Sequence, residues 1–156
     1  MKRIIAYNLL LLAVLTTVAS LMLQGLLPSW LTSLQIYISC ALIGGVGGIT
    51  YCLRAVYLNA CVRKEWDKEW YPWYYIRPIV SLICGAVSSI FLKAGLLVLD
   101  ATQSPDSNLL GYYALAFIAG FNVDKFVAKL EDIAHATWGI EKSRANNSAI
   151  KDNKNG

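Results

Sequence analysis

The chain has 156 residues, of which 56% are hydrophobic and only 15% are charged, against about 25% charged residues in a typical soluble domain. The 50 residues from Ile4 to Leu53 contain no Lys, Arg, Asp or Glu. As a helix this run would be about 75 Å long, far beyond the roughly 30 Å of a bilayer's hydrocarbon core. These features exclude a soluble enzyme, a secreted disulfide-rich module and a disordered chain, and they predict a small integral membrane protein.

The first apolar segment extends from about Ile5 to Leu27, after Lys2 and Arg3, and it ends at Pro28. A secretory signal peptide also begins with basic residues, but its apolar region covers only about 7–15 residues. The longer run in this chain predicts a retained first transmembrane helix.

The next two apolar segments extend from about Leu34 to Val56 and from about Pro78 to Leu99. Between them lies a basic loop that contains Arg63, Lys64 and Lys68. A short acidic connection, Asp100 to Asn108, follows the third segment. We expect both segments to be transmembrane helices.

The fourth apolar segment, Leu109 to Phe121, would form about 20 Å of helix, which is short for a crossing. It either crosses, with its last turn buried in the bundle, or re-enters the membrane. A crossing places 13 of the 14 basic residues on one side, with Lys93 as the exception, as the positive-inside rule expects. The charges therefore favour four spans, with both termini in the cytoplasm.

A cytoplasmic amphipathic helix is predicted from Asn122 to Ile140, with Asn122 as its N-cap and Gly139 as its C-cap. Its less polar residues recur at helical spacing and form one stripe: Phe126, Leu130, Ile133, Thr137 and Ile140. This stripe would dock on the protein's own loop or the membrane surface, or else on a partner protein or another copy. The predicted fold is thus an all-α polytopic membrane protein: a four-helix transmembrane domain (1–121), this helix (122–140) and a disordered polar tail (141–156).

Small residues mark two predicted membrane helices. Gly44 and Gly48 let another helix approach closely, either within one protomer or between protomers. In the third helix Ser81, Gly85, Ser89 and Lys93 recur every four residues and share one face, and the first three are candidates for helix packing or oligomer contacts. Lys93 either extends to the outer interface, beside Asp100, or lines an oligomeric pore.

Aromatic residues gather just before the third helix and predict an interfacial aromatic belt, composed of Trp66, Trp70, Trp73, Tyr74 and Tyr75. Arg77 is positioned to hold a lipid phosphate. Aromatic residues among basic ones also occur in single-strand nucleic-acid sites. Here Glu65, Asp67 and Glu69 offset the basic charge, so direct nucleic-acid binding is not expected.

No pattern typical of catalysis or cofactor binding is found in the sequence. The cysteines, Cys40, Cys52, Cys61 and Cys84, lack metal-ligand spacing, and His135 is the single histidine. No nucleophile with a base, no HExxH motif and no phosphate-binding loop is present. We therefore expect a non-enzymatic protein that holds no metal and no cofactor.

Two stretches carry a resemblance: Arg77 to Ser81 leading to Lys93-Ala94-Gly95-Leu96-Leu97, and Leu115 to Phe121 leading to Lys129-Leu130-Glu131. The chain resembles small four-span bacterial inner-membrane proteins of anti-phage defence, such as the membrane subunit of the Kiwa system, and this resemblance implies location in a bacterial inner membrane. The resemblance implies an oligomeric membrane sensor or scaffold that works with a cytosolic effector protein. The alternative is an oligomeric pore lined by the face from Ser81 to Lys93.

Overall fold

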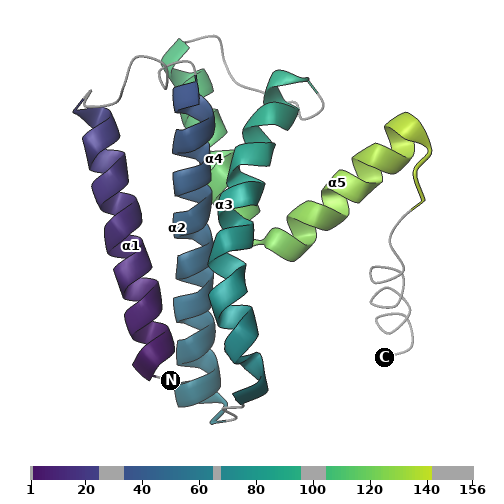
Figure 1. The fold of residues 1–156 in the computed structure, drawn as a ribbon. Helices are drawn as coiled ribbons and strands as arrows, with labels where there is room; N and C mark the ends of the chain where they lie inside the picture. Colours follow the sequence, from purple (N-terminus) through teal and green to yellow (C-terminus); the bar gives the residue numbers. More distant parts are fainter. Residues whose placement is uncertain (1, 25–33, 65–67, 96–104, 142–156) are drawn as a thin grey trace. The chain divides into compact units, whose positions relative to one another are not determined.

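The computed structural model describes residues 2–24, 34–64, 68–95 and 105–141, and within these ranges it is helical and contains no strand (Figure 1). The all-α prediction is therefore confirmed for this part of the chain. The chain divides into two compact units, Met1–Val123 and Asp124–Gly156.

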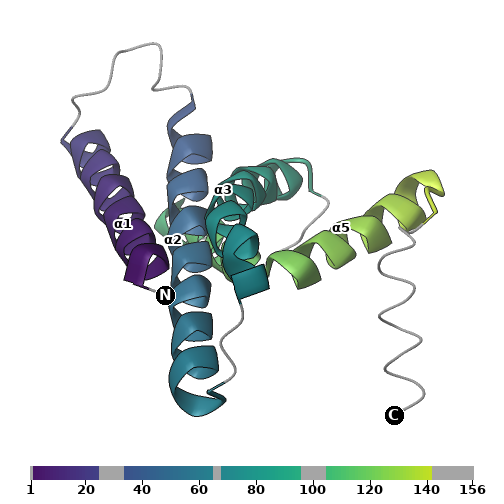
Figure 2. The same ribbon diagram turned by 60° about the horizontal axis from the view of Figure 1, so that its bottom comes forward.

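Three helices of the first unit are long and apolar enough to cross a membrane: α1 (Lys2–Leu23), α2 (Gln35–Tyr57) and α3 (Tyr71–Lys93). Both ribbon views place α1 beside α2 (Figures 1 and 2). Together the three helices are compatible with a multi-pass membrane protein. The predicted end of the first helix at Leu27 lies outside the described residues.

The N-terminus and the α2–α3 connection lie at the same end of the first unit (Figure 1). Ile4, near the start of α1, packs in one buried cluster with Cys52 and Val56 of α2 and Tyr74 of α3. Helix α1 therefore runs antiparallel to α2. This end of the bundle also carries the basic residues Lys2 and Arg3.

Helix α3 begins at Tyr71, seven residues before the predicted start at Pro78, so this boundary was wrong. Pro72 occupies the first turn, where the missing N–H costs no hydrogen bond. Pro78 then lies inside the helix and is fully buried. The helix ends at Lys93, and the predicted continuation to Leu99 is partly outside the described residues.

Helix α4 (Pro105–Phe121) begins within the connection that was predicted to extend to Asn108. Its 17 residues correspond to about 26 Å, and its apolar part, Leu109–Phe121, is shorter than the three long helices. The Cys40 thiol lies 3.9 Å from the Tyr112 carbonyl oxygen, and the Phe121 ring contacts Tyr51. Helix α4 therefore runs parallel to α2 and ends before α2 does.

Helices α2, α3 and α4 meet at glycines. A Cβ atom built on Gly44 of α2 would lie 2.7 Å from the Gly85 Cα of α3 and 2.7 Å from the Ser81 carbonyl oxygen. A Cβ built on Gly120 of α4 would overlap the Gly44 carbonyl. The three backbones are thus in direct contact, which only glycine permits at these positions.

The second unit is built around one helix, α5 (Val123–Trp138). It ends at Trp138, before Gly139, whose φ of +67° is left-handed and whose N–H donates to the His135 carbonyl oxygen at 3.0 Å. Ile140 of the predicted stripe therefore lies after the helix. Residues 142–156, predicted to be a disordered tail, lie outside the described residues.

Candidate functional site

The α2–α3 hairpin ends in an irregular turn. Helix α2 continues into a π-helical turn, Leu58–Val62 (η2), and α3 is preceded by a 3₁₀ turn, Lys68–Trp70 (η3). Lys64 adopts a left-handed φ of 58°, which turns the chain away from η2. Short π-helical segments are frequent at functional sites because they displace side chains from the regular helical positions.

A cavity of about 480 Å³ opens at this end of the hairpin, and we call it the hairpin pocket. Its lining residues are Tyr51, Arg54, Ala55, Leu58, Asn59, Arg63, Trp70, Trp73 and Tyr74. Tyr51, Ala55 and Leu58 follow one another at spacings of four and three, which puts them on one face of α2 and the start of η2. The volume lies within the range of small-molecule sites, about 300–1,000 Å³.

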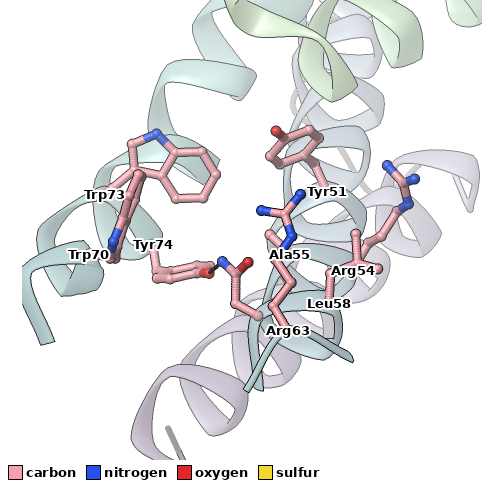
Figure 3. Close-up of a pocket in the computed structure, with 9 residues that line it drawn as sticks. Tyr51, Arg54, Ala55, Leu58, Arg63, Trp70, Trp73 and Tyr74 are labelled. Atoms are coloured by element: carbon pink, nitrogen blue, oxygen red, sulfur yellow. Dashed lines mark hydrogen bonds between the residues drawn. The ribbon is translucent and has the colours of Figure 1, made fainter. Parts of the chain in front are cut away.

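The two walls of the hairpin pocket differ in chemistry (Figure 3). Trp70, Trp73 and Tyr74 form the wall contributed by η3 and α3. Across from them, Arg63 extends from the end of η2 toward the ring of Tyr51. Aromatic faces and guanidinium groups therefore share one cavity.

Asn59 and Tyr74 connect the two walls through a side-chain hydrogen bond. The Asn59 amide nitrogen donates to the Tyr74 hydroxyl oxygen at 3.2 Å. Tyr74 is only 1% exposed because its ring belongs to the buried cluster with Ile4, Cys52 and Val56. This bond fixes the position of η2 against the start of α3.

Arg77 lies behind the pocket wall, where it is only 5% exposed. Its guanidinium carbon is 4.0 Å from the centroid of the Tyr51 ring and 4.6 Å from that of Trp73, and the two ring centroids are 5.7 Å apart. Both rings line the hairpin pocket. Arg77 thus connects α2 to α3 by cation–π contacts and adds positive charge behind the pocket.

The electrostatic character of the pocket is positive. Arg54 and Arg63 are both exposed, and no acidic side chain is among the described residues that line the cavity. Guanidinium groups bind carboxylate and phosphate oxygens in a planar, two-pronged geometry. The arrangement is chemically suited to an anion that also has an apolar part.

The predicted aromatic belt divides between this pocket and the core. Trp70 is 54% exposed, Trp73 is partly buried and Tyr74 is buried. Tyr75 packs on Tyr7 of α1, with ring centroids 4.9 Å apart. Trp66 lies outside the described residues.

The predicted small and polar stripe of α3 faces the other helices of the same chain. Besides the Gly44–Gly85 contact, a Cβ on Gly48 would overlap the Ser81 side chain. The Ser81 hydroxyl lies 2.9 Å from two carbonyl oxygens, those of Arg77 and of Gly120 in α4. Ser89 is buried, and its hydroxyl donates to the Ala86 carbonyl oxygen at 2.7 Å.

Lys93 is the last residue of α3 and is exposed. Its ammonium nitrogen donates to the Tyr37 hydroxyl oxygen at 3.2 Å and lies 4.4 Å from the Tyr37 ring centroid. The charge is therefore held at the end of the helix, beside the start of α2. Asp100, its predicted neighbour, lies outside the described residues.

On α5 the predicted stripe differs in exposure along its length. Phe126 is buried, Leu130 and Ile133 are partly buried, and Thr137 is exposed. Lys125 and Lys129 are exposed, as expected for residues off the stripe. The His135 ring nitrogen Nδ1 lies 3.2 Å from the Ile140 carbonyl oxygen.

The described residues contain no group of three or more His, Cys, Asp or Glu that could hold a metal ion, and their four cysteines are free. Tyr51, Arg54, Asn59 and Arg63 line the pocket but were not among the residues predicted to form a site. The spacing of Tyr51, Ala55 and Leu58 on one helical face was the signal that could have indicated it. Comparison of the chain with protein-family models, curated proteins and solved structures finds no match.

Proposed function

We propose that this protein is a non-enzymatic, oligomeric sensor or anchor of the bacterial inner membrane, which couples a membrane event to a cytosolic partner protein in phage defence. The observation that carries this proposal is α5, an amphipathic helix that belongs to a compact unit separate from the bundle. A chain with three long apolar helices has little other surface outside the membrane with which to engage a soluble protein.

The charge pattern supports an orientation with both termini in the cytoplasm. Lys2 and Arg3 lie at the same end of the first unit as the α2–α3 connection, with Arg63 and Lys64. The side with more basic residues is the cytoplasmic side in most multi-pass proteins. The hairpin pocket then opens toward the cytoplasm, and α4 crosses as the fourth span.

The polar stripe of α3 favours an anchor over the alternative, an oligomeric pore. The Ser81 hydroxyl is within hydrogen-bond distance of carbonyl oxygens in α3 and α4, and the Gly85 Cα lies against Gly44. A lumen would need this face to be accessible to water. In the described bundle it is used for packing within one chain.

The test is photo-crosslinking in cells that carry the full-length protein and its genomic neighbours. A photoreactive amino acid at Leu130 or Ile133 is expected to crosslink one soluble protein, identified by mass spectrometry. The same probe at Lys125 or Lys129, on the charged face of α5, is the matched control and should crosslink it much less. Crosslinks to lipid or to the chain itself from all four positions would contradict partner recruitment.

The defence role has a separate test in phage plating. Leu130→Glu is expected to abolish any protection that the wild-type protein and its neighbours give, because a charge disrupts the apolar stripe. Lys129→Glu, which adds the same side chain on the exposed face, should keep it. Equal plating with and without the wild-type protein, across a broad phage panel, would remove phage defence from the proposal.

A further inference from the structure

We propose that the hairpin pocket is a binding site for an anionic phosphate ester, with Arg54 and Arg63 binding the phosphate and the aromatic wall binding the apolar part of the ligand. The site goes beyond partner recruitment by α5 and does not depend on it. The ligand chemistry has two possible sources, the headgroup of an anionic phospholipid or a soluble phosphate ester, which binding measurements can distinguish.

The charge of the pocket favours an anion. Two exposed guanidinium groups, those of Arg54 and Arg63, line a cavity of about 480 Å³. The described lining residues include no carboxylate to neutralise them. Arg77 adds a third positive charge behind the rings of Tyr51 and Trp73. Several positive charges around a partly enclosed cavity attract anions more strongly than isolated charges on an open surface.

The positions of the two arginines favour phosphate among anions. Arg54 comes from the regular part of α2, whereas Arg63 follows the π-helical turn and extends toward the Tyr51 ring (Figure 3). The Arg63 backbone is held in place because its N–H donates to the Leu58 carbonyl oxygen at 2.8 Å. Arg54 and Arg63 thus line the cavity from different turns of the hairpin, with the Arg63 guanidinium beside Tyr51 and the Arg54 guanidinium at the edge away from the aromatic wall (Figure 3). Such an arrangement suits a group with several acceptor oxygens, and phosphate is one.

The aromatic wall favours a ligand that carries an apolar part. Trp70 is 54% exposed, and its ring centroid lies 6.5 Å from that of Trp73 in an edge-to-face arrangement. Exposed tryptophan at a helix start is typical of the membrane interface, where glycerol and acyl groups begin. The pocket therefore offers an apolar surface next to its cationic one, which a bare inorganic anion would not use.

The experiment uses the full-length protein, purified in a neutral detergent, and three probes. Dihexanoyl phosphatidylglycerol carries phosphate and short tails, dihexanoylglycerol carries the tails alone, and glycerol 3-phosphate carries the phosphate alone. Tryptophan fluorescence and native mass spectrometry measure binding. We expect phosphatidylglycerol to bind saturably, and dihexanoylglycerol to bind at least about tenfold more weakly because it lacks the anion.

Substitutions in the hairpin pocket test whether phosphatidylglycerol binds there. Arg54→Gln/Arg63→Gln is expected to weaken phosphatidylglycerol binding at least about tenfold, since charge-assisted hydrogen bonds to phosphate are lost. Lys2→Gln/Arg3→Gln removes the same number of charges from the same end of the bundle, outside the pocket, and should change binding less than about twofold. Trp70→Ala, which removes an exposed side chain, is expected to weaken phosphatidylglycerol binding and to leave glycerol 3-phosphate binding little affected.

Each outcome decides the proposal. Arginine-dependent binding of phosphatidylglycerol alone supports a lipid headgroup, and equally tight arginine-dependent binding of glycerol 3-phosphate supports a soluble ester. Equal losses in the Arg54/Arg63 and Lys2/Arg3 variants would show general surface attraction and overturn the site. Absence of saturable binding by the folded wild-type protein would overturn it as well. None of these results bears on crosslinking from α5, so the two proposals fail separately.

Discussion

Arg77 shows how a charged residue is accommodated near the start of a long apolar helix. Its guanidinium group contacts the rings of Tyr51 and Trp73, on two different helices, and only 5% of the residue is exposed. Planar guanidinium stacks on aromatic faces, whereas the ammonium of lysine is a compact and strongly hydrated charge. The side chain therefore has a structural role in addition to any contact with a ligand.

Replacing Arg77 by Lys is expected to destabilise the protein by about 1–2 kcal/mol, because the charge remains buried while the guanidinium contacts with the two ring faces are lost. Thermal unfolding in mild detergent, followed by tryptophan fluorescence, measures the effect. Arg54→Lys is the matched control, since Arg54 is exposed on α2, and it should unfold near the wild-type temperature. Equal stability of the Arg77→Lys variant would show that the cation–π contacts contribute little.

The conductance of a Lys93 variant can distinguish an anchor from a channel. Its ammonium group donates to Tyr37 at the end of the bundle, so replacement by Gln retains a polar donor there. We expect Lys93→Gln to leave the conductance of reconstituted vesicles at the wild-type background. Tyr37→Phe, which removes the hydroxyl acceptor alone, should behave in the same way.

A channel would give a different result in the same bilayer measurement. If Lys93 of several copies lined a lumen, the ring of like charges would repel cations. A robust wild-type conductance whose ion selectivity shifts in Lys93→Gln, at matched protein levels, would make this protein a channel. That outcome would replace the anchor proposal.

At the scale of the helices, the glycine contacts explain how α2 and α3 approach each other and α4. Gly44 contacts Gly85 on one side and Gly120 on the other. Between helices in lipid, close backbone approach supplies the packing that the hydrophobic effect supplies in water. Adding even one methyl group at this position therefore separates helices along their length.

Gly44→Ala is expected to destabilise the bundle by about 1–3 kcal/mol, because its Cβ meets backbone atoms of α3 that cannot rotate away. Gly120→Ala is also expected to destabilise the bundle, because its Cβ would overlap the Gly44 carbonyl of α2. The control is Ala114→Val on the exposed face of α4, which adds volume without a helix contact. Unfolding of the glycine variants at the temperature of the control would contradict backbone contact.

A Gly48 variant can distinguish packing within one chain from contact between chains. The sequence is compatible with both, and in the described bundle Gly48 lies against Ser81 of the same chain. Gly48→Leu is therefore expected to unfold the protein rather than to yield a folded monomer. Size-exclusion chromatography and membrane crosslinking would contradict this if the variant were folded and monomeric while the wild type is oligomeric.

The first two helices were predictable from sequence because a charge-free run admits few other structures. The start of α3 was not, since Pro72 and Pro78 both permit a helix start and sequence alone does not choose between them. The glycine positions could be identified as close-packing residues, but their partners Gly85 and Gly120 are set by the depth at which α3 and α4 pack. Pairing between distant segments of the chain decides that depth.

The hairpin pocket was partly predictable. The aromatic residues and Arg77 stood out by composition, and the interfacial role assigned to them remains a prediction. On the opposing wall, Tyr51, Ala55 and Leu58 recur at helical spacing, but Arg63 did not stand out because it follows the π-helical turn, and an extra residue in a helical turn leaves no periodic signal. In the sequence, Arg54 and Arg63 contribute only to the count of basic residues on one side of the membrane.

At the scale of the whole molecule, the topology depends on whether α4 crosses the membrane. Its 17 residues correspond to about 26 Å, somewhat less than a hydrocarbon core of roughly 30 Å. Yet it lies against both α2 and α3, with Gly120 in contact with Gly44 and Ser81. A short helix held by two longer neighbours can cross with its end shielded by protein instead of lipid.

Reporter fusions test whether α4 crosses the membrane. We expect reporters placed after Lys64 and after Arg144 to read cytoplasmic, and one placed after Thr102 to read external, because this arrangement puts 13 of the 14 basic residues inside. Alkaline phosphatase and green fluorescent protein at each position give opposite signals, so a misfolded fusion is recognised by the loss of both. An external reading after Arg144, with Lys64 still cytoplasmic, would mean that α4 returns without crossing. The six basic residues after Phe121 would then lie outside, and the cytoplasmic partner proposed for α5 would have no access to it.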